Sequence, residues 1–155
     1  VYLRANPGGD PFFGPNLASQ RDWFLYGLGL GLYWGEGNKA NKLAVRLGNT
    51  DPGLLRAFLH FLDVTYRIDK SRLRVGLQIF SDVDVSAATK YWCKELGLQP
   101  RQFQKTATRS RLRRGTYTQK APFGVLTVYF SNTKLRATIM AAIEKLREDC
   151  KALPM

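Results

Sequence analysis

Gly27-Leu28-Gly29-Leu30-Gly31-Leu32-Tyr33-Trp34-Gly35-Glu36-Gly37 is a glycine-rich segment at the end of a predicted helix. The helix is expected to begin near Ser19, which has the spacing of a capping box with Asp22, and to continue to about Gly35. Each glycine inside a helix costs roughly 0.5–1 kcal/mol relative to alanine. We therefore expect these glycines to be required by close packing against another part of the structure.

Gly27, Gly31 and Gly35 recur every four residues and so lie close to one face of this helix. A face of small residues lets another backbone approach closely. Because the chain has one such helix, we expect its partner to be the same helix of a second subunit in a two-fold dimer. The large side chains of the helix have a spacing that favours the core over base stacking; they are Trp23, Phe24, Tyr26, Tyr33 and Trp34.

Glu36 is expected at the C-terminal end of this helix, which is the unfavourable end of the macrodipole for an anion. In a two-fold dimer, two such carboxylates would approach each other near the axis and attract a cation. Hard divalent cations such as Mg²⁺ or Mn²⁺ take carboxylate and carbonyl oxygens, waters and phosphate oxygens. The simpler alternative is an exposed residue at the helix end, followed by the terminating glycine Gly37.

Periodicity along the rest of the chain predicts an α+β domain, with helices interleaved with mostly antiparallel strands. In the first strand, Leu43, Val45 and Leu47 are expected to share one face. Strands are predicted over 41–49, 72–80, 102–109 and 124–130, and helices over 51–66, 84–96 and 133–151.

The domain organisation is predicted from where Pro and Gly residues interrupt regular structure. Residues 1–16 are predicted to be a Pro/Gly-rich flexible arm, residues 17–151 a single domain, and residues 152–155 a tail. The chain begins with Val1 rather than methionine, so we expect a fragment from which an upstream domain is missing.

Composition excludes several classes of protein. With 155 residues, 45% apolar and 23% charged, the chain is neither disordered nor too small for a core. No apolar run approaches the roughly 20 residues of a membrane span, and no secretion signal is present. Cys93, Cys150 and the single histidine, His60, make neither a disulfide framework nor a closed zinc site. We expect a reduced intracellular protein, in cytoplasm, nucleoid or organelle matrix, with no membrane partner and no small-molecule cofactor.

The charge indicates a polyanionic partner. Lys and Arg total 24 against 12 acids, which gives a net charge of +12. Residues 101–120 contain no acid, and their cations are predicted to contact phosphates; they are Arg101, Lys105, Arg109, Arg111, Arg113, Arg114 and Lys120. The alternatives are a ribosomal or merely soluble basic protein, or an acidic membrane surface. The Gln, Thr, Ser and Gly between these charges favour nucleic acid over membrane.

The outward faces of the predicted strands carry side chains suited to reading base edges in a major groove. The alternative is an ordinary solvated sheet face, which would carry more acids. The residues assigned to this face are Lys42, Arg46, Arg72, Arg74, Gln78, Gln102, Gln104, Thr127 and Tyr129.

The segment from Gly29 to Gly37 resembles the LAGLIDADG motif of homing endonucleases. The segment 45–51 with the leucines that follow is similar to the family's first catalytic strand and next helix, and 124–135 is similar to its last strand and helix. The likeness covers roughly 20–66 and 122–147 and is weak over 70–121. It implies the family fold, in which a mixed, mostly antiparallel sheet has helices on one face and the motif helix lies at a two-fold dimer interface.

The resemblance also implies roles for individual residues. Glu36 matches the acidic residue that binds the catalytic divalent ion, and the carbonyl of Gly35 often adds to the metal shell. Asn49 matches the polar residue that orders the hydrolytic water. In the family, lysine often follows at the next position, which here is Thr50.

A lysine from elsewhere would have to replace that missing cation. Lys134, near a strand-to-helix junction, is the expected substitute, with Lys39 and Lys120 as alternatives. Lys39, which often follows the motif in related variants, is also assigned to DNA binding.

The activity implied by this resemblance is divalent-metal-dependent hydrolysis of phosphodiester bonds in double-stranded DNA. One motif per chain implies a homodimer acting on a long, roughly palindromic site. A second hypothesis is a catalytically degenerate DNA-binding protein or regulator on the same fold, which Thr50 favours. A third is an RNA-binding, maturase-like role.

Overall fold

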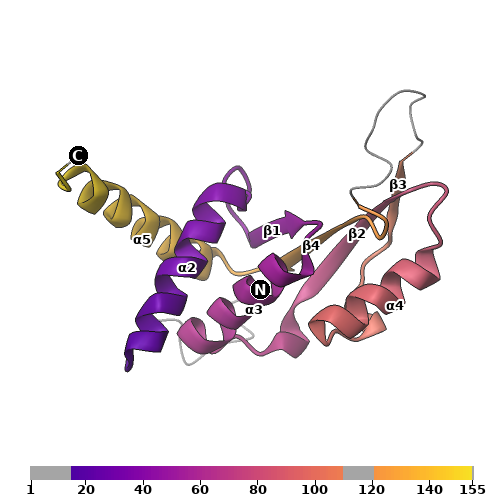
Figure 1. Cartoon of the computed structure of the whole chain (residues 1–155), viewed down its shortest axis with the longest axis horizontal. Helices are drawn as coiled ribbons and strands as arrows, with labels where there is room; N and C mark the ends of the chain where they lie inside the picture. Colours follow the sequence, from indigo (N-terminus) through magenta and orange to yellow (C-terminus); the bar gives the residue numbers. More distant parts are fainter. Residues whose placement is uncertain (1–14, 110–120, 155) are drawn as a thin grey trace.

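Helices and strands alternate along the chain in the computed structural model, which describes residues 15–109 and 121–154 (Figure 1). In chain order the elements are α2 (Gln20–Glu36), β1 (Val45–Asn49), α3 (Pro52–Tyr66), the 3₁₀ helix η1 (Lys70–Arg72), β2 (Arg74–Phe80), α4 (Val85–Leu96), the 3₁₀ helix η2 (Pro100–Gln102), β3 (Ala107–Arg109), β4 (Val125–Phe130) and α5 (Thr133–Lys151). The predicted α+β class is confirmed.

The four strands form one mixed sheet in the order β1-β4-β2-β3. Strand β4 is antiparallel to both β1 and β2, whereas β3 runs parallel to β2. The register aligns Arg46, Tyr129 and Arg74 in one row across three strands, and Gly48, Thr127 and Gly76 in the next row. The predicted mixed, mostly antiparallel sheet is therefore confirmed.

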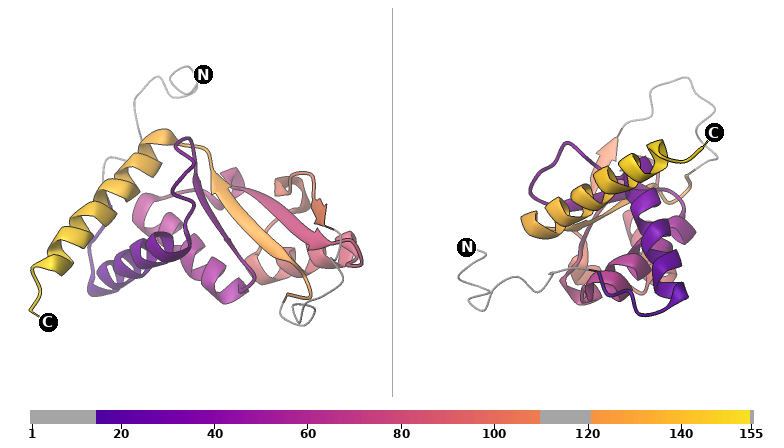
Figure 2. Two further views of the ribbon diagram at one scale, coloured as in Figure 1. Left: turned by 90° about the horizontal axis from the view of Figure 1, so that it is seen from above. Right: turned by 90° about the vertical axis from the view of Figure 1, so that its left-hand side faces the viewer.

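One face of the sheet is buried and the other is partly open to solvent. The buried face packs against α3 and α4, which lie on the same side of the strands, while α2 and α5 lie toward the β1 end (Figures 1 and 2). Its buried residues are Val45, Leu47, Val75, Leu77, Ile79, Leu126, Val128 and Phe130. The opposite face, called the open face below, carries Arg46, Gly48, Arg74, Gly76, Gln78, Val125, Thr127 and Tyr129.

Helix α2 begins and ends as the sequence predicts. The Ser19 hydroxyl accepts from the Asp22 N–H at 3.2 Å, and the Asp22 carboxylate accepts from the Ser19 N–H at 2.9 Å, which completes the capping box. The inner side of the helix packs on α3, where the ring of Tyr33 stacks on Phe58 with centroids 5.9 Å apart. Gly37 ends the helix and leads the chain toward β1.

The strand predicted over 41–49 begins only at Val45, and the placement of Leu43 in the core is wrong. The Asn41 side-chain oxygen accepts from the backbone N–H groups of Leu43 at 2.9 Å and Ala44 at 3.0 Å. Such side-chain-to-backbone bonds compete with strand pairing. Leu43 is consequently 68% exposed, and Ala44 is buried instead.

Two further strand predictions were too long. Arg72 lies in η1, and its guanidinium lies over the Phe130 ring with Cζ 5.4 Å from the centroid, so it does not share the strand position of Arg74. Gln102 is only 3% exposed, which overturns its assignment to the wet face. Its amide donates to the carbonyls of Lys70 at 2.8 Å and Leu73 at 3.2 Å, a structural role.

Some sequence predictions fall outside the described residues. These are most of the predicted N-terminal arm, residues 1–14, and the cations Arg111, Arg113, Arg114 and Lys120. Within 15–109 and 121–154, no helix is both long and apolar enough to cross a membrane.

Candidate nucleic-acid interface and acidic helix end

The open face carries positive charge without acidic residues. Strands β1 to β4 contain Arg46, Arg74 and Arg109 and no aspartate or glutamate. In the central row, the Arg46 guanidinium lies over the ring of Tyr129, with Cζ 5.4 Å from the ring centroid. Burial raises the pKa of the Tyr129 phenol, and the charges of Arg46 and Arg74 oppose that shift. This face therefore attracts anions and offers donors to acceptor groups.

The next row of the open face is low because it contains two glycines. A Cβ at Gly48 would lie 2.6 Å from the Thr127 hydroxyl oxygen, so a side chain there would have to displace that hydroxyl group. A Cβ at Gly76 would lie 3.5 Å from the nearest Tyr129 ring carbon, which is ordinary contact. In the row Gly48–Thr127–Gly76, the Thr127 hydroxyl and the Tyr129 ring thus lie close to the backbone where side chains at the two glycines would be.

The far edge of the open face is tied together by Gln78 and Arg109. With its amide oxygen turned toward the guanidinium, Gln78 accepts from Arg109 Nη2 at 3.0 Å. This bond links β2 to β3 and fixes both side chains.

Glu36 lies at the β1 edge of this sheet. Gly37 forms an antiparallel bridge with Leu47, and the Asn38 N–H donates to the Arg46 carbonyl at 2.9 Å. Continuing that register by one residue brings Glu36 opposite Gly48. Glu36 is exposed, so the structure brings an accessible carboxylate to the end of the glycine row.

Asn49, the predicted water-ordering residue, is the last residue of β1 and follows Gly48 directly. It therefore lies close along the chain to the edge where Glu36 is found. Its side-chain oxygen accepts from the Asp51 N–H at 2.9 Å in the turn that leads into α3. Thr50, at the position where the family often has lysine, is exposed.

Lys134, the predicted substitute cation, is exposed in the first turn of α5 but is not brought to Asn49 within the chain. Strand β4 ends at Phe130, opposite Val45, whereas Asn49 pairs with Leu126. The two residues therefore lie toward opposite ends of the β1–β4 pair, whose length is about 13 Å from the rise of a strand.

Lys39 has a structural partner at the end of α2. Its ammonium donates to the Trp34 carbonyl at 2.6 Å and so satisfies one of the last carbonyls of the helix. The Lys39 carbonyl in turn accepts from Arg136 Nη2 of α5 at 2.7 Å. Arg136 was not predicted from the sequence; its only signal is its place one turn into α5.

The other predicted DNA contacts differ in position. Lys42 is exposed in the loop before β1, and Arg101 and Lys105 are exposed between α4 and β3. They lie outside the rows of the open face, which suits contacts to a phosphate backbone better than contacts to bases.

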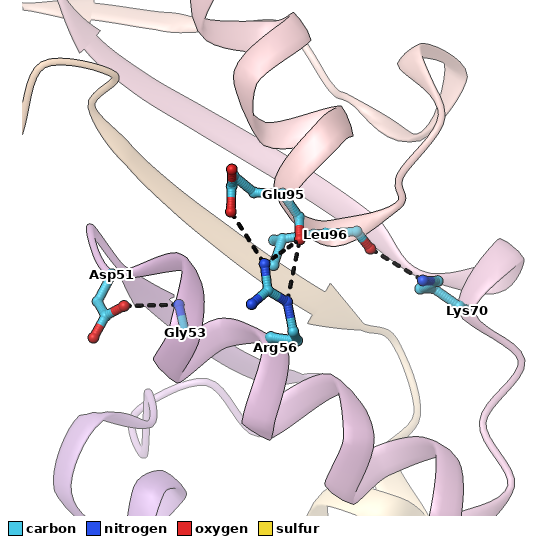
Figure 3. A network of polar contacts seen from close by, with 6 residues as sticks. All are labelled: Asp51, Gly53, Arg56, Lys70, Glu95 and Leu96. Atoms are coloured by element: carbon cyan, nitrogen blue, oxygen red, sulfur yellow. Dashed lines mark hydrogen bonds and ion pairs between the residues drawn. The ribbon is translucent and has the colours of Figure 1, made fainter.

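Two other cations serve the fold instead (Figure 3). Arg56 Nη2 donates to the Glu95 carbonyl at 2.7 Å and forms an ion pair with the Glu95 carboxylate at 3.1 Å. Lys70 Nζ donates to the Leu96 carbonyl at 3.0 Å. Both therefore cap the C-terminal end of α4, where positive charge is stabilising.

On the outer side of α2, three glycines have open space around them in the described part of the chain. A Cβ built on Gly27, Gly31 or Gly35 would meet nothing within 4 Å. Trp23 and Phe24 are 59% and 70% exposed, so their predicted place in the core is wrong. A groove between α2 and α5 continues this surface, and Trp23, Tyr26, Leu30, Ala142 and Leu146 are among its lining residues.

A divalent cation would find one carboxylate at this site in a single chain. Within the ranges described, no three His, Cys, Asp or Glu side chains lie close enough together to hold a metal ion. The Glu36 carboxylate and the Gly35 carbonyl are hard oxygen donors of the kind that Mg²⁺ and Mn²⁺ accept. The donor set thus fits such an ion where a second subunit and a phosphate complete it.

No family model, curated protein or solved structure matches the chain.

Proposed function

We propose that this chain is one subunit of a homodimeric, metal-dependent endonuclease that cleaves double-stranded DNA in the manner of LAGLIDADG homing endonucleases. The observation that carries this proposal is the junction between the acid-free open face and the exposed carboxylate of Glu36. A surface of Arg, Thr, Tyr and Gln has the donors needed to read a major groove. Metal-assisted hydrolysis needs a carboxylate beside the bound duplex to hold the ion, and Glu36 at the edge of this face would supply it.

The outer side of α2 supports a two-fold dimer. Gly27, Gly31 and Gly35 leave room for a second backbone, and the exposed rings of Trp23 and Phe24 would lose water on association. An isologous contact through this face would bring Glu36 and Glu36 of the partner subunit toward one axis. It would also set two open faces on either side of that axis, as a pseudo-palindromic site requires.

Each residue would have a separate task in this dimer. Glu36 and the carbonyl of Gly35 would hold Mg²⁺ or Mn²⁺, which supplies Lewis-acid activation of water and stabilisation of the leaving oxygen. Asn49, with its oxygen engaged by the Asp51 N–H, would present its amide N–H groups to a water or a phosphate. The open face would hold the duplex in register so that the scissile bond meets Glu36.

A comparison of cleavage with binding tests the proposal. We expect the wild type with Mg²⁺ to cut members of a plasmid library, and Glu36→Gln to lose at least about 100-fold in cleavage rate while binding DNA as tightly. Asp63→Asn, which makes the same charge change at an exposed position of α3, should cut normally. Equal cleavage by wild type and Glu36→Gln would contradict the assignment of Glu36.

A second candidate is a DNA-binding protein on the same fold that does not cleave. Thr50 at the expected lysine position and the distance of Lys134 from Asn49 favour it. In the same assay this candidate requires sequence-specific binding by the wild type, no cleavage with Mg²⁺ or Mn²⁺, and no effect of Glu36→Gln. Stronger competition by structured RNA than by duplex DNA would contradict both candidates.

A further inference from the structure

Gly76, Tyr129 and Arg46 are stacked on the open face, with the Tyr129 ring between the backbone of Gly76 and the guanidinium of Arg46. Tyr129 OH and Cε1 lie within 3.8 Å of where a Cβ on Gly76 would be, so the ring leans over the bare backbone of β2. The Arg46 guanidinium lies over the same ring, with Cζ 5.4 Å from its centroid. The absence of a side chain at Gly76 lets the ring lie low, and the ring then serves as a platform for Arg46.

The guanidinium on this platform is held by the ring, and no acid among the described residues forms an ion pair with it. Arg46 is half-buried, and its Nε is buried with no hydrogen-bond partner in the described part of the chain. No strand of the sheet contains an acid. Fixing a long cationic side chain sacrifices rotamer freedom, and a buried donor without an acceptor is a further cost. An acceptor from outside the chain would offset both costs.

The neighbouring arginines are engaged differently. Arg74 Nη1 donates to the Leu73 carbonyl at 3.1 Å, so that side chain turns back to its own backbone. Arg109 donates to Gln78. Of the three strand arginines, Arg46 lies over an aromatic ring, and no oxygen acceptor in residues 15–109 or 121–154 engages its guanidinium in competition with a ligand.

We propose that Arg46 reads a guanine in the major groove of the DNA target, and that Tyr129 is the residue that positions it. This inference rests on the proposed function and adds a specificity-determining residue to it. A guanidinium is a planar fork whose paired N–H groups match the two major-groove acceptors of guanine, O6 and N7. A preorganised fork loses less freedom on binding than a free one, so discrimination is gained at a single base position.

The test is a selection of bound duplexes from a randomised library in the absence of divalent metal, with each variant checked for folding by its thermal unfolding. We expect a guanine at one fixed position of each wild-type half-site. Arg46→Ala and Arg46→Lys should each lose at least tenfold of the preference at that position and leave the other positions unchanged. Loss in Arg46→Lys, which keeps the charge, shows that the fork is needed.

Variants of the platform separate positioning from structure. Tyr129→Phe keeps the ring and should keep the guanine preference, whereas Tyr129→Leu should weaken it severalfold. Lys105→Ala removes an exposed cation and should weaken binding evenly across sequences, reducing the slope of affinity against salt by about one.

The outcomes distinguish this inference from the proposed function. If wild type yields a consensus that Arg46→Ala and Arg46→Lys share unchanged, the role of Arg46 is overturned and the DNA-binding function stands. If Tyr129→Leu keeps the full preference, the role of the platform is overturned. If wild type selects no sequence from the duplex library, both the inference and the proposed function are overturned.

Discussion

The two sides of α2 use glycine for different reasons. On the inner side, a Cβ at Gly29 would overlap the ring of Phe61, so the packing of the chain explains this glycine. On the outer side, a Cβ at Gly27, Gly31 or Gly35 would meet no described residue within 4 Å, so alanine would fit at each in this part of the chain. Each of these three glycines weakens the helix and is not required by the described packing, which is the pattern that the proposed dimer would use.

The largest effect is expected at the inner side. Gly29→Ala should lower the free energy of unfolding by about 1–3 kcal/mol, because the added methyl group must displace the Phe61 ring in a close-packed core. Urea unfolding of dilute protein would measure this. Gly31→Ala is the matched control and should raise the stability of the dilute monomer by about 1 kcal/mol through helix propensity. A loss of similar size in both variants would contradict the comparison.

Gly31→Leu tests the outer side through assembly. The side chain points into open space in the single chain, so the subunit should fold normally, while the close approach of a second α2 is blocked. Sedimentation at a concentration where the wild type is a dimer should give the mass of a monomer for this variant. An unchanged mass would remove α2 from the interface.

Ser19→Ala changes the end of α2 without touching either side. Loss of the bond from the Asp22 N–H to the Ser19 hydroxyl should cost about 1 kcal/mol in the free energy of unfolding. Ser131→Ala is the control and should change the stability little, because Ser131 is exposed and the N-cap residue of α5 is Asn132. Equal losses in the two variants would show that the capping box adds nothing.

The smallest effect per residue is expected from alkaline pH at the inner side. Burial raises the pKa of Tyr26, Tyr33 and Tyr66 above the ordinary value of 10.0. The unfolded chain then releases phenol protons before the folded one, so stability is full below about pH 9 and falls as pH rises through 10. At pH 10, each tyrosine that stays protonated in the folded chain should lower the free energy of unfolding by about 0.4 kcal/mol. Urea unfolding at pH 8 and pH 10 measures it, and Tyr66→Phe should reduce the loss; stability that rises with pH would contradict this.

Local signals predicted most of the fold. Ser19 with Asp22 marked the start of α2, the helix expected over 84–96 agrees with α4, and the alternation in β2 predicted its buried face. The errors came from polar side chains that bond to backbone, as Asn41 does before β1 and Gln102 does beneath η1. The spacing of apolar residues does not distinguish an Asn or Gln side chain that bonds to backbone from one that faces solvent.

The candidate site was predictable only in parts. Alternation in β1, β2 and β4 placed Arg46, Arg74 and Tyr129 on one face, but their alignment in a row depends on strand register. Register also decides that Lys134 and Asn49 lie toward opposite ends of a strand pair. Because that pairing joins segments about 80 residues apart in the chain, no local pattern contains it.

The strand order also constrains how the protein is made. Strand β4 is the last strand to be synthesised, yet it lies between β1 and β2 and supplies the pairing partner of each. Until Phe130 has left the ribosome, a growing chain therefore leaves β1 without a strand partner and β2 paired only with β3. The open face would be assembled only after most of the chain is complete, so a product that ends before β4 lacks this face and exposes strand edges prone to aggregation.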